Sequence, residues 1–170
     1  ALRWQSILRT LGHSVRIEDR APARCDVLVA LHATRSVRIV EEARSRMPKC
    51  AIVLAATGTD IYRYLGHPDT LRSLDIADQI VVLQSEAKSV LSRKHAGKAC
   101  VIYQSVQPLS VKRPDNPRQL RVVVAGHIRA VKDPLRTAYA ARRLPQDSRI
   151  RVVHYGNVIE QKLGQRVIEE

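Results

Sequence analysis

Six short runs of apolar, mostly β-branched residues recur along the chain, and stretches with helical spacing of apolar residues separate them. Such near-continuous runs are typical of strands that are buried on both faces. Strands that alternate with helices form parallel sheets, which the helices cover through right-handed crossovers. The sequence therefore predicts an α/β fold. The expected strands span 13–18, 25–31, 50–56, 79–83, 99–103, 120–125 and 150–154, and the expected helices span 2–11, 35–47, 69–77, 86–95, 134–143 and a last stretch toward Glu170.

A proline-rich stretch interrupts this alternation after the strand expected over 99–103. Its prolines are Pro108, Pro114 and Pro117. Proline continues neither a helix nor a central strand, so the stretch predicts an extended linker over 108–119. We expect one Rossmann-like domain over 1–107, with its first strand missing, and the start of a second over 120–170.

Composition narrows the possible classes of protein. The 170 residues are 45% hydrophobic, which is enough for a packed core. No run approaches the roughly 18 apolar residues of a membrane span, and no charged-then-apolar leader opens the sequence. Cys25, Cys50 and Cys100 form no CxxC pair, so we expect neither a disulfide framework nor structural zinc. These features favour a reduced, cytoplasmic setting without a membrane span.

The net charge of +13 favours anionic partners such as phosphates, an acidic surface or nucleic acid. The 22 arginines and 7 lysines are scattered along the chain rather than gathered in one patch. Aromatic residues make up only 4%, with no phenylalanine to serve as a base-stacking platform. The scattered arginines favour a simple compositional bias on a solvated surface, and a nucleic-acid partner is the less favoured interpretation.

Polar loops follow several expected strands, at the carboxyl end where ligands of parallel α/β sheets bind. Thr57, Gly58, Thr59 and Asp60 combine a flexible backbone, two hydroxyls and a carboxylate. This loop either holds a polar ligand or simply turns the chain and caps a helix. His32 ends another expected strand, where a histidine serves either catalysis or structure.

A second set of loop residues is basic. Gly126, Arg129 and Lys132 follow the strand expected over 120–125, and Pro134 suits the first turn of the next helix. An arginine fork, a lysine charge and free helix amides form a plausible diphosphate site. The alternative is a loop whose cations face water. The Gln84–Ser85 loop after the strand expected over 79–83 is a further candidate.

Familiar nucleotide and hydrolase motifs are missing: the sequence has no GxGxxG, GxSxG or GxxxxGK[ST], and no HxH or HExxH for a metal. However, five segments in order resemble retaining GT-B glycosyltransferases of family 4, most closely the selenosugar synthase branch of selenoneine biosynthesis. The most specific of their motifs are Thr-Gly-Thr-Asp, Tyr-Gln-Ser-Val and Arg-x-Val-Lys-Asp-Pro. The segments are Cys25–His32, Leu54–Tyr62, Ala77–Gln84, Val101–Val106 and Gly126–Pro134.

The resemblance implies two Rossmann-like domains of the GT-B kind, the first for the acceptor and the second for a UDP-sugar donor. It implies transfer of the sugar to selenophosphate, with no metal or other cofactor. Arg129 and Lys132 match the family's phosphate-contacting pair, and Gly126 shares their loop. Asp60 and its loop match the family's acceptor-side cleft, and we expect His32 to contact the acceptor there as well. No residue is assigned as the catalytic base.

Two family features have no counterpart in this sequence. One is the first strand with its glycine-rich loop, and the other is a Glu-Gly-Gly…Glu stretch that grips the nucleotide sugar. We therefore expect the chain to be an internal part of a longer enzyme, with both domains incomplete. A basic nucleic-acid-binding module and an inactive glycosyltransferase remnant are the alternatives.

Overall fold

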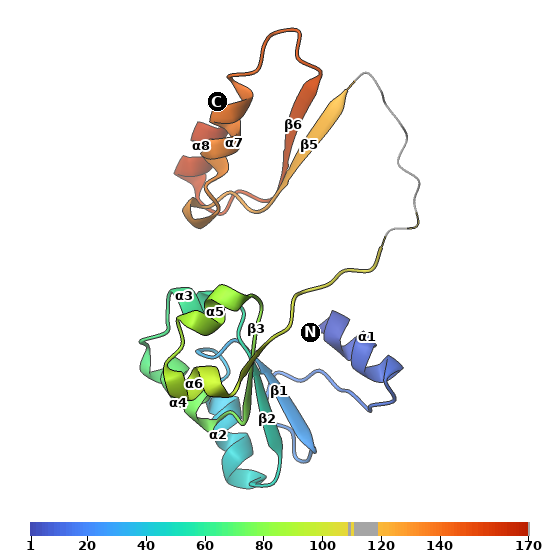
Figure 1. Ribbon diagram of the computed structural model, residues 1–170, viewed down its shortest axis with the longest axis vertical. Coiled ribbons are helices and arrows are strands. Elements are labelled where there is room, and N and C mark those ends of the chain that lie inside the picture. Colours follow the sequence, from blue (N-terminus) through green and yellow to red (C-terminus); the bar gives the residue numbers. More distant parts are fainter. Residues whose placement is uncertain (109, 111–118, 170) are drawn as a thin grey trace. The chain divides into compact units, whose positions relative to one another are not determined.

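The computed structural model describes residues 1–108, 110 and 119–169 (Figure 1). The chain divides into two compact units, Ala1–Pro108 and Leu109–Glu170, called unit 1 and unit 2 below. Both are built from parallel strands joined through helices, so the predicted α/β class with parallel sheets is confirmed.

Unit 1 contains a four-stranded parallel sheet whose spatial order follows the sequence. The strands are β1 (Val27–Leu31), β2 (Ala51–Ala55), β3 (Gln79–Val82) and β4 (Ala99–Val101), in the order β1-β2-β3-β4. Right-handed crossovers that always step in one direction place every connecting helix on the same face of the sheet. Figure 1 shows this arrangement for α2 (Val37–Arg46), α4 (Pro68–Ile76), α5 (Ser85–Ser89) and α6 (Arg93–Gly97).

The core of unit 1 lies between this face and the helices. Alternate residues of β2 and β3 point toward the helices, and they are fully buried together with Val40 of α2 and Leu74 of α4. These strand residues are Ile52, Leu54, Ile80 and Val82. A further helix, α1 (Leu2–Thr10), opens the unit and has no buried residue.

Unit 2 has a smaller sheet of two parallel strands, β5 (Leu120–Ala125) and β6 (Ile150–Tyr155). The 3₁₀ turn η1 (Ala130–Lys132) and helix α7 (Pro134–Ala141) connect the two strands, and α8 (Gln161–Glu169) follows β6. Only Ile128 and Leu135 are buried hydrophobic residues among those described in this unit.

Two local expectations were wrong, and one short helix was missing from them. Residues 13–18 form no strand, and one expected helix is divided into α5 and α6. The Ser92 hydroxyl accepts a hydrogen bond from the His95 backbone N–H and so starts a new helix. The four-residue helix α3 (Thr59–Tyr62) was not among the expected helices, although Gly58 caps it as one interpretation of this loop allowed.

The expected linker over 108–119 lies almost entirely outside the described residues, which include only 108, 110 and 119 of it. The expected final helix is α8, and Glu170 also lies outside the described residues. Among the helices of the described ranges, none is both long enough and apolar enough to cross a membrane.

Candidate functional site

The parallel register of β1 and β2 brings two of the predicted loops together at one edge of unit 1. Asp60, which is 0% exposed, joins them. Its Oδ2 accepts a hydrogen bond from the Ala33 backbone N–H at 2.8 Å, and its Oδ1 accepts one from the Thr57 N–H at 2.9 Å. The carboxylate therefore fixes the loop after β1 against the loop after β2.

His32 lies beside this carboxylate. Its Nδ1 is 4.0 Å from Asp60 Oδ2, and its side chain is only 13% exposed. Within residues 1–108, 110 and 119–169, no group forms a hydrogen bond with that buried nitrogen. The backbone of His32 has a φ of 73°, in the left-handed region that few non-glycine residues adopt. An unpartnered buried ring nitrogen and a strained backbone together make His32 the most unusual side chain at this edge.

The loop after β2 turns directly into α3. Gly58 has a φ of 103°, and its carbonyl accepts the Ile61 and Tyr62 N–H groups that begin the helix. Thr57 and Thr59 are exposed on either side of it. The predicted residues His32, Thr57, Gly58 and Asp60 are thus brought together, and the Thr57 hydroxyl also donates to Asp60 Oδ1 at 3.5 Å.

A shallow pocket of about 170 Å³ opens next to this loop, between the carboxyl ends of β2 and β3. Tyr62 of α3 contributes a phenol, and its oxygen accepts a hydrogen bond from the Gln84 side-chain amide. The lining is neutral: Ala56, Thr57, Gly58, Ile61, Tyr62, Val82, Leu83, Gln84 and Ala87. The sequence predicted the Gln84 loop as a candidate site. It did not predict Tyr62, because no helix was expected over 59–62.

In unit 2, the loops after β5 and β6 pack closely. A Cβ on Gly156 would lie 2.0 Å from the Gly126 carbonyl oxygen, so the chain tolerates no side chain there. The Gly126 N–H donates to the Tyr155 carbonyl at 2.9 Å, and a ring nitrogen of His154 lies 2.7 Å from the Gly126 oxygen. A Cβ on Gly126 itself would meet nothing within 4 Å, so the space beside Gly126 is open.

The two predicted cations of this unit are exposed and lie on one short segment. Arg129 immediately precedes η1, and Lys132 ends it. Asp133 has its carboxylate 2.5 Å from Arg136, and Glu160 accepts the Ala130 N–H at 3.1 Å. Among the described residues, no acidic side chain pairs with Arg129 or Lys132. Their charge is therefore available to an anion near the start of α7.

Among the described residues, no three or more His, Cys, Asp or Glu side chains form a group that could hold a metal ion. A polar cluster of unit 1 lies beside α6. There the Asp75 carboxylate accepts hydrogen bonds from Lys94 Nζ at 2.6 Å and from His95 Nε2 at 2.9 Å. These contacts, led by that of Lys94, lower the pKa of Asp75 to about 2.

Comparison with known proteins adds no family to this description. No protein-family model matches the sequence, and no curated protein matches it.

Proposed function

We propose that this chain forms part of a retaining glycosyltransferase that uses a UDP-sugar donor and transfers the sugar to selenophosphate. The observation that carries the proposal is the exposed pair Arg129 and Lys132, unmatched by described acidic side chains, beside the open space at Gly126. The order of the motifs along the chain supports the choice of donor and acceptor.

The donor side of the proposal follows from charge. When the bond between the anomeric carbon and the diphosphate breaks, negative charge develops on the departing UDP. Arg129 would contribute a planar fork and Lys132 a point charge to that diphosphate. Such preorganised donors stabilise a leaving group without a metal ion.

The acceptor side rests on the pocket of unit 1. Its volume of about 170 Å³ is below the roughly 300–1,000 Å³ of sites for drug-sized ligands, so it suits a small acceptor. Thr57, Tyr62 and Gln84 offer hydroxyl and amide groups there, and no cation lines it. Selenium as the attacking atom rests on the motif resemblance alone.

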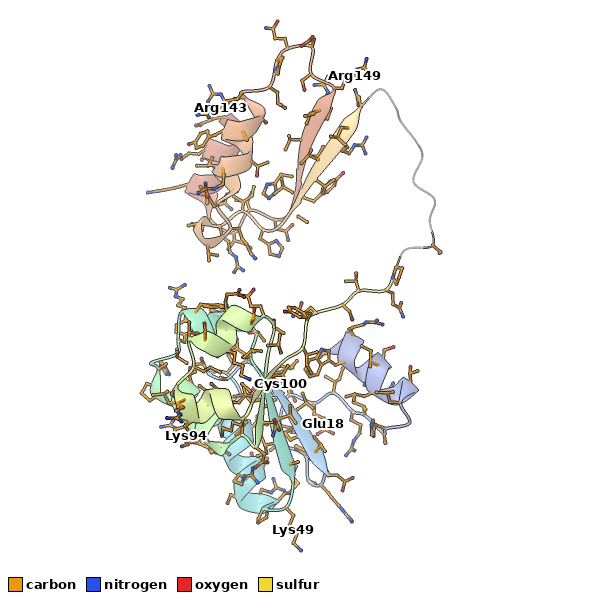
Figure 2. All side chains as sticks on the ribbon, in the orientation of Figure 1. Glu18, Lys49, Lys94, Cys100, Arg143 and Arg149 are labelled. Carbon is orange, nitrogen blue, oxygen red and sulfur yellow. The ribbon has the colours of Figure 1, made fainter. Side chains whose placement is uncertain are left out.

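A titration of the chain with UDP, monitored by calorimetry or by NMR line broadening, tests whether the Gly126 loop binds the diphosphate of the donor. Arg129→Ala with Lys132→Ala should weaken UDP binding at least about tenfold, because each charged hydrogen bond contributes about 1.5–3 kcal/mol. Arg143→Ala with Arg149→Ala is the matched control. Figure 2 shows these two arginines at the end of unit 2 where β6 begins, opposite the Gly126 loop.

Equal UDP affinity in the two double variants would refute the phosphate assignment. If UDP binds as proposed, UDP release from UDP-sugars with and without selenophosphate tests the acceptor. If UDP release did not depend on selenophosphate but rose with an ordinary hydroxyl acceptor, the chain would still be part of a glycosyltransferase. The assignment of selenophosphate as the acceptor would then be wrong.

A further inference from the structure

Two of the three cysteine thiols lie in contact, although 25 residues separate them in the sequence. Cys25 Sγ is 3.4 Å from Cys50 Sγ. Cys25 comes just before β1 and Cys50 just before β2, and the register pairs Val27 with Ala51. The Ala51 N–H also donates to the Asp26 carbonyl at 3.0 Å, so the backbone between the thiols is held by the sheet.

The two thiols differ in access. Cys50 is 3% exposed, and its carbonyl oxygen accepts a hydrogen bond from Arg44. Cys25 is partly exposed. The third cysteine, Cys100, is exposed on β4 and provides an ordinary surface thiol in the same molecule.

We propose that Cys25 and Cys50 are a redox pair that closes to an intramolecular disulfide by exchange with small disulfides of the glutathione class, and that reopens with the corresponding thiols. The sulfurs need to approach from 3.4 Å to about 2.05 Å for the bond to form. This redox site is independent of the proposed transferase function.

The exchange balances in two steps. The partly exposed Cys25 thiolate attacks one sulfur of the small disulfide, which forms a mixed disulfide and releases one small thiolate. The Cys50 thiolate then attacks Cys25 Sγ and releases the second. Two electrons pass from the protein sulfurs to the small disulfide, and the two protons lost by the cysteines end on the two small thiols.

The surroundings of Cys25 make the first step slow at neutral pH. Burial raises the pKa of the Cys25 thiol to about 11, and contact with Cys50 and the carboxylates of Asp26 and Glu18 act in the same direction. Only the thiolate attacks, so the rate of closure should still rise about tenfold per pH unit above pH 8, where an ordinary exposed thiol begins to level off.

The test uses the full chain incubated with mixtures of oxidised and reduced glutathione, then alkylated and digested with trypsin. Cleavage after Arg24, Arg35, Lys49 and Arg63 places the two cysteines on separate peptides, 25–35 and 50–63. We expect these peptides to be linked, an intact-mass loss of about 2 Da, and full reversal by reduced glutathione. Cys100→Ser should retain the link, whereas Cys25→Ser in that background should abolish it.

A denatured sample of the wild-type chain provides the second comparison. In urea, all three cysteine pairings should appear, because loop closure favours the shorter loop only weakly. The proposal is overturned if the folded chain links Cys100 as often as Cys25 to Cys50. It is also overturned if Cys25 and Cys50 each carry glutathione without joining, or if Cys25 closes no faster at pH 9.5 than at pH 8.

Discussion

Asp60 shows how one buried side chain can hold a candidate site together without facing a ligand. Its two oxygens accept the N–H groups of Ala33 and Thr57, which belong to loops after two different strands. Asp60→Ala would leave both donors unpaired, and the Ala33 N–H is buried, so we expect it to lower the free energy of unfolding by about 1–3 kcal/mol. Urea denaturation measures this change.

Asp60→Asn should be compared with Asp60→Ala. The asparagine carbonyl oxygen can accept one of the two backbone N–H groups, whereas its NH₂ group cannot accept the other. We expect a loss between those of wild type and Asp60→Ala. A stability of Asp60→Ala equal to that of wild type would show that water replaces the carboxylate, and that this carboxylate does not hold the two loops together.

Asp75 gives a prediction for pH. Hydrogen bonds from Lys94 and His95 lower the pKa of Asp75 to about 2 in the folded chain, from an ordinary value near 3.8. A lowered folded-state pKa stabilises the fold above the unfolded-state pKa, and this stabilisation is lost as pH falls through the folded-state value. The urea midpoint of wild type should therefore exceed that of Asp75→Asn at pH 6, and the difference should shrink between about pH 5 and pH 2.

The Asp75 effect should be small, because the pair is half exposed and screened by solvent. Asp19→Asn removes an exposed carboxylate of the same unit and serves as the control, with a midpoint that follows wild type throughout. If the difference between Asp75→Asn and wild type stayed constant down to pH 2, ionisation of Asp75 would not be its source.

At the scale of elements, the sheets were predictable and the short turns between them were not. Runs such as 50–56 and 79–83 have the short, near-continuous apolar content that is typical of a buried strand, and β2 and β3 lie within them. The helix α3 has four residues, too few for a periodic pattern, and depends on the backbone of Gly58. Residues 13–18 alternate in polarity, yet they pair with no strand of the described sheets.

The candidate site was predictable to the same extent. Parallel strands place their carboxyl ends at one edge, so the sequence alone could associate His32 with the 57–60 loop. The burial of Asp60 and the contact between Cys25 and Cys50 depend on strand register, which no local motif encodes. Tyr62 reaches the pocket only because α3 forms.

Gly58 provides a test of that local geometry. Its φ of 103° is a conformation that side chains disfavour, whereas a Cβ there would meet nothing within 4 Å. Gly58→Ala should therefore lower the free energy of unfolding by about 1–2 kcal/mol through backbone strain alone. Gly66 is also surrounded by open space but has no such φ, so Gly66→Ala should change the unfolding free energy by less than about 0.5 kcal/mol. If urea denaturation showed equal effects for the two substitutions, the positive φ of Gly58 would not be the source of the destabilisation.

At the scale of the whole molecule, the net charge of +13 has to be separated from the specific placement of two cations. A scattered basic surface attracts any polyanion, and such binding weakens steeply as salt displaces the released counterions. Binding of a diphosphate at the Gly126 loop depends instead on Arg129 and Lys132 in particular. The two kinds of binding therefore predict different responses to salt and to substitution.

We expect duplex DNA to bind this chain only at low salt and without sequence preference. Its affinity in a gel shift should fall at least about a hundredfold between about 50 and 200 mM salt, as phosphate contacts alone require. Removal of Arg129 and Lys132 should weaken DNA binding no more than removal of Arg143 and Arg149, because each pair contributes the same two charges. UDP binding should distinguish the two pairs. A DNA complex that survives about 200 mM salt and excess competitor would instead favour the nucleic-acid-binding alternative, because scattered charges alone cannot maintain it.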